Sequence, residues 1–226
     1  MKNMNFIWTF FQRPNKIGES KAIQIENTLS RKIPMDVISA ISQRRSVRRY
    51  QRKPIDRALL VKMVNAARLA PSTINLQPLE YVVVDDDKTV RLLFPHARMG
   101  ALLPKQKRPT EQERPAAYIA VLVNTTIMKA GYEYDIGCAA QNMLLAAVSF
   151  GLGACFIRNI DRSEIRALLK VPAEYEIDTI IAAGYPAHEP VAEDARGDDV
   201  RYYLDESGVH RVPKRTIEKI LHVNRF

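Results

Sequence analysis

The chain has 226 residues, of which 46% are hydrophobic and 26% are charged, so it can bury one sizeable core and has neither a disordered nor a fibrous composition. One compact domain is the expected organisation. The formal net charge of +9 favours an acidic or phosphorylated ligand, although nucleic acid, a membrane surface and a phosphate-bearing cofactor would all satisfy that charge.

The first 34 residues are interpreted as an N-terminal extension, and residues 35–226 as the folded domain. Met4–Phe11 is apolar and aromatic, and Arg13 and Lys16 follow it. This stretch is too short to span a bilayer, and it lacks the small-residue cleavage site of a secretory signal. We expect the extension to be an arm that packs on a partner subunit, with contact to a membrane surface as the alternative.

Dense positive charge follows a short predicted helix over residues 36–45. Six basic side chains lie between Gln43 and Pro54, namely Arg44, Arg45, Arg48, Arg49, Arg52 and Lys53. An arginine fork matches phosphate oxygens two at a time, and the hydroxyl of Ser46 can add a donor at the same place. The run predicts an anion site, and a solvated basic helix end is the alternative.

The next elements are predicted from apolar spacing and from prolines. Residues 54–56 open a second helix, in which apolar positions repeat at helical spacing until Pro71 ends it. Two prolines and the Ser, Thr and Asn content predict a loop over Pro71–Pro78, and β-branched residues predict a strand over Glu80–Asp85. A short helix is expected over Asp87–Phe94.

Residues 99–114 contain Pro, Lys, Arg, Gln and Glu without periodicity, so we interpret them as a long, exposed and mobile excursion and a candidate lid. Ala116–Asn124 is a continuous apolar run, typical of a strand buried on both faces. Tyr134–Phe150 is apolar on nearly every side, which predicts a long helix buried in the core or against another subunit. Gly151 and Gly153 are expected to end this helix.

Strands and helices continue to alternate toward the C-terminus, which predicts an α/β architecture. Ala154–Ile157 and Glu176–Ala183 are predicted strands, separated by a helix that begins at the capping box Asp161-Arg-Ser-Glu164. Tyr202–Val212 is a predicted hairpin with its turn at residues 205–208.

The two cysteines and four histidines give no metal or disulfide signal. Cys138 and Cys155 lie in apolar surroundings without the paired spacing that a zinc site or a disulfide needs, and the histidines are scattered. We expect both cysteines to be buried thiols in a reducing cytoplasm, and we expect no metal site.

Four separated segments carry a further signal. They are Arg44-Arg-Ser-Val-Arg48 with Tyr50, Ala70-Pro-Ser-Thr-Ile-Asn-Leu-Gln-Pro78, Gly151-Leu-Gly-Ala-Cys-Phe-Ile157 and Ala183-Gly-Tyr-Pro-Ala187. Taken together, and in this order, they resemble the FMN-dependent nitroreductase family. The resemblance extends over residues 35–222 and leaves out the N-terminal extension.

This resemblance implies an α/β (α+β) sandwich, with a central mostly antiparallel or mixed sheet flanked by helices. It also implies an obligate homodimer, with helix 134–150 in the interface and one FMN in each of two shared clefts. The expected activity is that of an oxidoreductase that takes a hydride from NAD(P)H and passes electrons to a nitroaromatic, quinone or similar acceptor by a ping-pong mechanism. No nucleic acid and no membrane span are expected.

The resemblance further implies a phosphate and ribityl site made by residues from both ends of the domain: Arg44, Arg45, Ser46, Lys214 and Arg215. Arg48 would lie near the flavin pyrimidine ring, where a fixed cation stabilises the negative charge that builds up on reduction. By contrast, the remaining basic residues of the run are interpreted as surface charge: Arg49, Arg52 and Lys53.

Two further groups of residues would contact the flavin by resemblance. One is a loop that often reaches it from the second subunit, formed here by Pro71, Ser72, Thr73, Asn75 and Gln77. The other would run beside the ring and offer a backbone N–H toward N5, and it consists of Ile157, Arg158 and Asn159. No side chain is expected to be a covalent catalyst, because the cofactor carries the chemistry.

The chain departs from the common family pattern at two places. Many relatives have small residues where this chain has Arg158 and Asn159, and many have an aromatic residue where it has Leu79. Arg158 either points to solvent or favours an acidic substrate.

Three other functions fit parts of the sequence. Related folds also carry out dehydrogenation, dehalogenation or flavin fragmentation. A basic nucleic-acid or membrane-surface module would use residues 44–53 and 105–114, although only Tyr50 interrupts the first cluster as a stacking aromatic. A flavin-binding protein without catalytic activity is the third.

Overall fold

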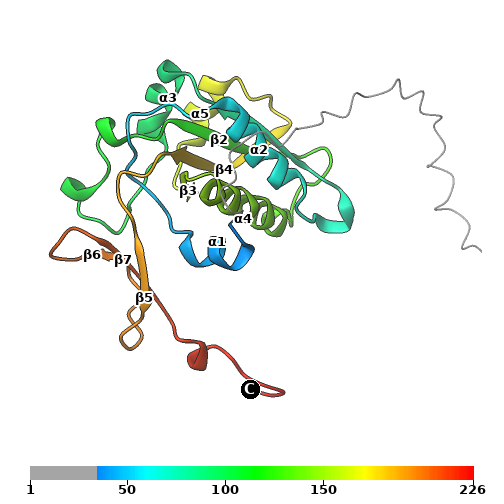
Figure 1. Ribbon diagram of the computed structural model, residues 1–226. Coiled ribbons are helices and arrows are strands. Elements are labelled where there is room, and N and C mark those ends of the chain that lie inside the picture. The colour runs from blue at the N-terminus through cyan, green and yellow to red at the C-terminus, as the bar shows by residue number, and fades with distance from the viewer. Residues whose placement is uncertain (1–34) are drawn as a thin grey trace, which may run out of the picture. The chain divides into compact units, whose positions relative to one another are not determined.

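Residues 35–226 are described by a computed structural model, and the predicted N-terminal arm lies outside them. A four-stranded sheet forms the centre, with its strands in the order β1-β2-β4-β3 and every neighbouring pair antiparallel (Figure 1). The strands are β1 (Leu79–Val84), β2 (Ala117–Asn124), β3 (Gly153–Ile157) and β4 (Tyr175–Gly184). Each of them falls within two residues of its predicted position.

Side chains of β2 alternate between two separate hydrophobic clusters, one on each face of the sheet. Tyr118 and Ala120 belong to the cluster that α3 (Asp87–Leu93) and α5 (Arg162–Leu169) cover. Ile119 belongs to the other cluster, which is covered by α2 (Arg57–Arg68) and α4 (Glu133–Ser149). The prediction of a strand buried on both faces is therefore confirmed, and the chain forms three layers.

Aspartates begin four of the five α-helices found in residues 35–226 by accepting a hydrogen bond from a backbone N–H of the first turn. Asp36 caps α1 (Val37–Gln43), and Asp56 caps α2. Asp161 accepts from the N–H of Glu164 at 3.3 Å, so the predicted helix start at this capping box is confirmed.

A second, three-stranded sheet holds the C-terminal part, in the order β5-β7-β6. The predicted hairpin is confirmed as β6 (Tyr203–Leu204) and β7 (His210–Lys214), and the N–H of Gly208 closes its turn on the carbonyl of Asp205 at 2.9 Å. The third strand, β5 (Val191–Asp194), pairs in parallel with β7 and was not predicted.

Residues 99–114 are less exposed than their composition predicts. Met99 and Leu103 are buried, and so is the guanidinium of Arg114, although most of the segment between them is exposed. The interpretation as a wholly exposed excursion was therefore wrong at these three residues, because they pack inward while their polar neighbours face outward.

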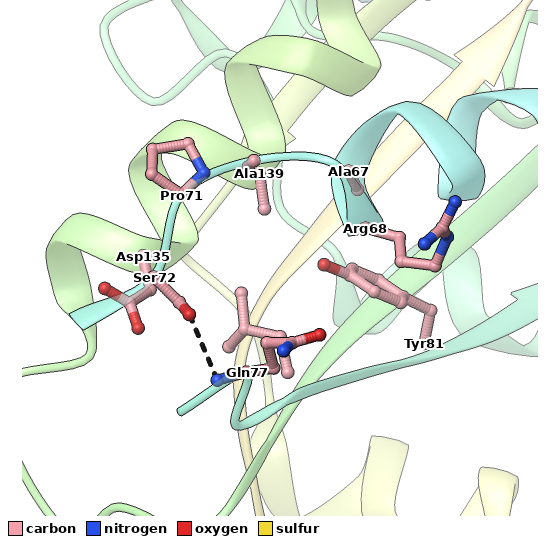
Figure 2. Close-up of a pocket in the computed structure, with 10 residues that line it drawn as sticks. Ala67, Arg68, Pro71, Ser72, Gln77, Tyr81, Asp135 and Ala139 are labelled. Atoms are coloured by element: carbon pink, nitrogen blue, oxygen red, sulfur yellow. Dashed lines mark hydrogen bonds between the residues drawn. The ribbon is translucent and has the colours of Figure 1, made fainter. Parts of the chain in front are cut away.

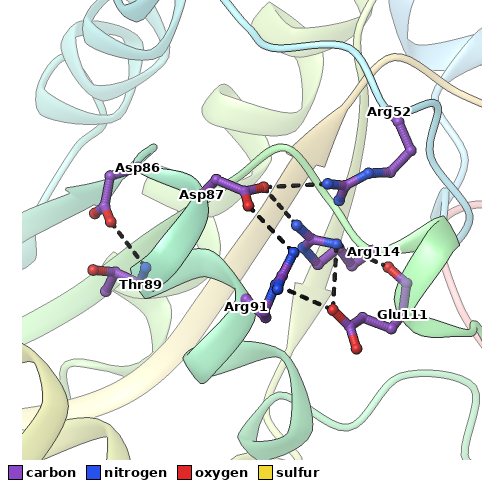
Figure 3. A network of polar contacts seen from close by, with 7 residues as sticks. All are labelled: Arg52, Asp86, Asp87, Thr89, Arg91, Glu111 and Arg114. Atoms are coloured by element: carbon purple, nitrogen blue, oxygen red, sulfur yellow. Dashed lines mark hydrogen bonds and ion pairs between the residues drawn. The ribbon is translucent and has the colours of Figure 1, made fainter.

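An ion-pair network ties the end of this segment to α3 (Figure 3). Asp87, at the start of α3, contacts Arg52, Arg91 and the buried Arg114. Glu111 contacts Arg91 at 3.2 Å and Arg114 at 3.6 Å. The network fixes the chain just before β2 enters the sheet.

One cysteine prediction was wrong. Cys155 is buried in β3, but Cys138 is exposed on α4. The helix buries one side against the sheet, whereas Tyr134 and Cys138 lie on a side that no element of residues 35–226 covers. A helix that is apolar all round does not reveal which of its sides packs within its own chain. No helix in the described part of the chain has the length and apolar character needed to cross a bilayer.

Candidate functional site

The arginine-rich segment lies against the free edge of β3. Ser46 forms a parallel bridge with Ala154, whose carbonyl accepts a hydrogen bond from the N–H of Val47 at 3.0 Å. The segment approaches so closely because Gly153 has no side chain, since a Cβ atom there would lie 2.7 Å from Val47. Gly184 has the same role further along, where a Cβ would lie 2.6 Å from the ring of Tyr50.

Val47 and Tyr50 are buried and anchor the segment in the core. The polar residues next to them are half-buried, namely Arg44, Ser46 and Arg48. Burial raises the pKa of the Cys155 thiol, and the nearby charges of Arg48 and Arg44 oppose this rise.

The guanidinium of Arg48 has a fixed position. Its Cζ atom lies 4.6 Å from the centre of the Tyr202 ring, and Nη1 donates to the carbonyl of Ser46 at 3.3 Å. Tyr202 also accepts a hydrogen bond from the N–H of Leu102 at 3.2 Å, so the same ring connects Arg48 to residues 99–114.

Ion pairing divides the basic residues of the segment into two groups. Arg49 pairs with Glu113 and Arg52 with Asp87, while Lys53 lies over the ring of Tyr185. In contrast, none of the ion pairs within residues 35–226 involves the other three, Arg44, Arg45 and Arg48. In addition, Nε of Arg45 is buried without a hydrogen-bond partner in this part of the chain. These three arginines are the ones available to bind an anion.

A groove of about 580 Å³ adjoins Arg45. It runs between the C-terminal ends of α1 and α4 and the segment that leads into β5, and its lining includes Val148, Gly151, His188 and Val191. Within residues 35–226, no group of three or more His, Cys, Asp or Glu side chains is arranged to hold a metal ion.

The predicted flavin-contacting loop lies elsewhere and has a strained backbone. Ile74, Asn75 and Gln77 have φ angles of 43°, 59° and 50°, a left-handed conformation that is costly for residues other than glycine. Inside the loop, the hydroxyl of Ser72 accepts a hydrogen bond from the N–H of Gln77 at 3.1 Å (Figure 2).

Asp135, in the first turn of α4, holds the start of this loop and was missed in the sequence. Its Oδ1 accepts hydrogen bonds from both the N–H and the hydroxyl of Thr73, each at 3.0 Å. A pocket of about 130 Å³ adjoins Asp135 and the loop and is also lined by Arg68 and Tyr81 (Figure 2). Burial raises the pKa of Tyr81 to about 12. An acidic residue in the first turn of a predicted helix was the available signal, but it does not indicate a loop 62 residues away.

The three residues predicted beside the flavin ring continue directly from β3. The carbonyl of Ile157 accepts a hydrogen bond from the hydroxyl of Thr179 at 2.7 Å. Arg158 is 61% exposed and pairs with Asp178 at 3.3 Å, so its charge already has an acidic neighbour. The carbonyl of Asn159 accepts from the N–H of Arg98.

Lys214 and Arg215 are exposed at the end of β7. The start of β5 lines the groove near Arg45, and the parallel register pairs Val191 with Arg211 and Asp194 with Lys214. Ala192, which pairs with Val212, also lines the groove, so Lys214 is two residues further along, or about 7 Å at strand spacing. No hydrogen bond in the described residues joins either basic residue to Arg44 or Arg45.

The predicted flavin loop and the arginine segment therefore lie beside opposite ends of α4. Asp135, which holds the loop, lies in the first turn, and Val148, which lines the Arg45 groove, lies in the last turn. They are 13 positions apart in the helix, which corresponds to about 20 Å along the axis. One chain does not bring the two groups together.

Comparisons with known proteins identify the family of the chain. The model of the Nitroreductase family matches residues 41–185, which include the arginine segment, the strained loop, β3 and Gly184. The chain belongs to the nitroreductase family. The predicted resemblance and the predicted fold class are thereby confirmed. Lys214 and Arg215 lie outside the matched residues.

Individual nitroreductase relatives cover most of the chain. A putative NADH dehydrogenase/NAD(P)H nitroreductase of Methanothermobacter thermautotrophicus is 32% identical over 177 residues, which is 76% of this chain and 88% of the relative. An FMN-dependent nitroreductase structure from Clostridium difficile has a TM-score of 0.61 at 27% identity, covering 84% of this chain and 99% of that one. A putative nitroreductase from Desulfovibrio desulfuricans, solved in complex with FMN, has a TM-score of 0.58 at 30% identity, covering 72% and 92%.

Proposed function

We propose that the chain is an NAD(P)H-dependent flavin oxidoreductase that binds FMN and reduces a small organic acceptor, such as a nitroaromatic or a quinone, by a ping-pong mechanism. Family membership and the names of the relatives support the activity and the cofactor. FMN, when bound, supplies the hydride-accepting and electron-donating chemistry.

The observation that carries the proposal is the set of arginines without a carboxylate partner in residues 35–226. Guanidinium groups that are half-buried and not neutralised by an acid favour an anionic ligand, and a phosphate accepts two parallel hydrogen bonds from each fork. Arg44, Arg45 and Ser46 are assigned to the phosphate end of FMN. Lys214 and Arg215 are assigned there as well, by resemblance alone.

Arg48 is assigned to the ring end of the flavin. Its stacking on Tyr202 fixes the guanidinium before any ligand binds, so its charge needs no reorganisation when negative charge develops nearby. Backbone groups of Ile157, Arg158 and Asn159 continue from β3 on the same edge of the sheet and are assigned to the ring as well.

The separation of the two groups along α4 supports a homodimer with shared sites. If two copies pack their α4 helices antiparallel about a two-fold axis, the loop of one subunit lies beside the arginine segment of the other. The surface needed for this packing is present as a stripe along α4 at helical spacing, formed by Tyr134, Cys138, Gln141, Leu145 and Val148. Val37 and Ile38 of α1 add apolar side chains that are 67% and 71% exposed.

The activity is tested on the full chain by anaerobic spectroscopy. We expect a yellow protein whose flavin absorbance bleaches on addition of NADH or NADPH without an acceptor and returns when a quinone is added. Initial rates at varied concentrations of both substrates should give parallel double-reciprocal lines. Intersecting lines would contradict the ping-pong mechanism, and a protein that neither retains nor binds FMN would contradict the cofactor.

The phosphate site is tested by charge-matched double variants. Arg44→Ala with Lys214→Ala should lose FMN during purification, because two of the phosphate's cations are removed. Arg52→Ala with Lys53→Ala removes the same charge from residues assigned to the surface and should retain FMN. Full flavin content in the first variant would show that the phosphate site lies elsewhere.

The shared site is tested by light scattering. Cys138→Asp puts charges into the centre of the α4 stripe and should yield a monomer that does not hold FMN. Leu92→Asp, at an exposed apolar position on α3, should remain a flavin-loaded dimer. A monomeric Cys138→Asp variant with full flavin content would contradict the sharing of the site between subunits.

A further inference from the structure

We propose that Asp135 is a positioning residue that holds the loop Pro71–Pro78 in its flavin-binding conformation. The inference rests on the proposed function, in which Ser72, Asn75 and Gln77 of this loop contact FMN. It assigns a role in cofactor affinity to a residue that belongs to α4 and not to the loop.

Asp135 is built into the fold as a fixed acceptor. Its side chain is only 4% exposed, and Oδ1 accepts two hydrogen bonds from Thr73. The first turn of α4 favours a carboxylate, because the free N–H groups of a helix N-terminus carry partial positive charge. Oδ2 is buried and has no partner within residues 35–226, so the contact with the loop uses one oxygen.

The loop depends on this contact because burial of its own apolar side chains contributes little to holding it. Three of its residues other than glycine have positive φ angles, and such a conformation persists only where the surroundings impose it. Ile74 is 86% exposed and Leu76 is 38% exposed, so burial of these apolar side chains contributes little. The restraints from outside this stretch include the hydrogen bonds to Asp135, while the loop itself adds the Ser72–Gln77 hydrogen bond and turns closed by the N–H groups of Asn75 and Leu76 on the carbonyls of Ser72 and Thr73.

Loss of Asp135 should therefore weaken FMN binding by lowering the fraction of molecules in which the loop has its FMN-binding conformation. When only a fraction of molecules has the competent conformation, the apparent dissociation constant rises by the inverse of that fraction. We expect Asp135→Ala to weaken FMN binding about 10- to 100-fold, which corresponds to about 1.4–2.8 kcal/mol.

Three variants separate the positioning role of Asp135 from the effect of its charge and from general destabilisation. Asp135→Asn keeps a carbonyl oxygen at the place of Oδ1 and should bind FMN within about threefold of the wild type, a difference under about 0.7 kcal/mol. Ile74→Gly, introduced into Asp135→Ala, should recover part of the affinity because glycine adopts positive φ without strain. Asp86→Ala removes a helix-capping carboxylate from α3 and should lower the melting temperature without changing FMN affinity.

The experiment is a fluorescence titration of the flavin-free full chain with FMN, together with amide hydrogen exchange of residues 73–77 before FMN is added. Support would be fast exchange and weak binding in Asp135→Ala, slow exchange and tight binding in Asp135→Asn, and partial recovery with Ile74→Gly. Wild-type affinity in Asp135→Ala, or equally weak binding in both Asp135 variants, would overturn the proposal. A wild-type chain that binds no FMN would overturn the proposed function itself, and the exchange data would still report whether Asp135 orders the loop.

Discussion

Replacement of Gly153 by alanine tests whether the close approach of the arginine segment to β3 is required. A methyl group there would meet Cβ and both Cγ atoms of Val47 at 2.7–2.8 Å, distances that real structures do not tolerate. Because Cβ of Val47 is attached to the backbone, a change of rotamer does not relieve the clash, and the segment must move. The movement strains or breaks the hydrogen bond from the N–H of Val47 to Ala154.

The expected cost follows from these two effects. Overpacking of a core position costs about 1–3 kcal/mol and the lost hydrogen bond about 1 kcal/mol, so Gly153→Ala should be destabilised by about 2–4 kcal/mol. For a domain of this size, that corresponds to a fall in melting temperature of about 4–16 °C. FMN affinity should fall as well, because Arg44, Ser46 and Arg48 move with the backbone.

Val47→Ala is the matched control, since it loses about 2 kcal/mol by removing buried methyl groups but leaves the segment in place. Thermal denaturation and FMN titration below the melting range separate the two variants. Val47→Ala should melt early and still bind FMN, whereas Gly153→Ala should fail in both assays. A Gly153→Ala variant with wild-type melting temperature and wild-type affinity would refute the reasoning.

Three further predictions concern stability and are measured by urea or thermal denaturation. Arg114→Ala should lose about 3 kcal/mol, because it removes a buried guanidinium from an ion-pair network, whereas Arg91→Ala, at an exposed position in the same network, should lose less than about 1 kcal/mol. Burial lowers the pKa of His210 from 6.5 to about 4, so as the pH falls the unfolded state takes up a proton before the folded state does. The wild type should therefore keep its full stability above pH 6.5 and lose up to about 3 kcal/mol as the pH falls to 4, a loss that the His210→Phe variant should not show. Lys170→Gly should gain up to about 1 kcal/mol, since Lys170 ends α5 with a φ of 54°. Equal losses of stability in Arg114→Ala and Arg91→Ala would contradict the first prediction. The same dependence of stability on pH in the wild type and His210→Phe would contradict the second, and a Lys170→Gly variant less stable than the wild type would contradict the third.

The fold was predictable where short-range chemistry decides the structure. Asp56 and Asp161 can cap only the helices that follow them, and the unbroken apolar run of β2 fits only a strand covered on both faces. Gly208 marked the hairpin turn because its φ of 77° suits glycine. The family resemblance added the fold class, because four separated motifs occurred in the right order.

The features that the sequence did not predict depend on contacts between residues that are far apart in the chain. The four residues of β5 have no strand pattern of their own, and they become a strand because β7 lies beside them. The exposure of Cys138 depends on which side of α4 meets the sheet. The strained backbone at Ile74 has no sequence signal, and the carboxylate that holds the neighbouring Thr73 comes from α4, 62 residues away in the chain.

In the candidate site, too, some features follow from the local sequence and others from contacts between distant residues. The sequence indicated that the arginine run binds an anion and separated Arg44, Arg45 and Arg48 from their basic neighbours through the resemblance. The structural reason for that separation is the position of Glu113 and Asp87, which come from other elements and neutralise Arg49 and Arg52. The joining of both halves of the site across a dimer stays a prediction.

The bridge between Ser46 and Ala154 also affects how the protein behaves in a crowded solution. β3 is the last strand of the sheet, and an uncovered last strand offers a row of unpaired backbone groups to which strands of other molecules can attach. The segment from Arg44 to Tyr50 covers this edge at Ala154, where Ser46 forms its bridge, and it carries positive charges that would repel further copies of the same chain. We therefore expect a fall in soluble yield, as well as in FMN affinity, from any substitution that detaches this segment.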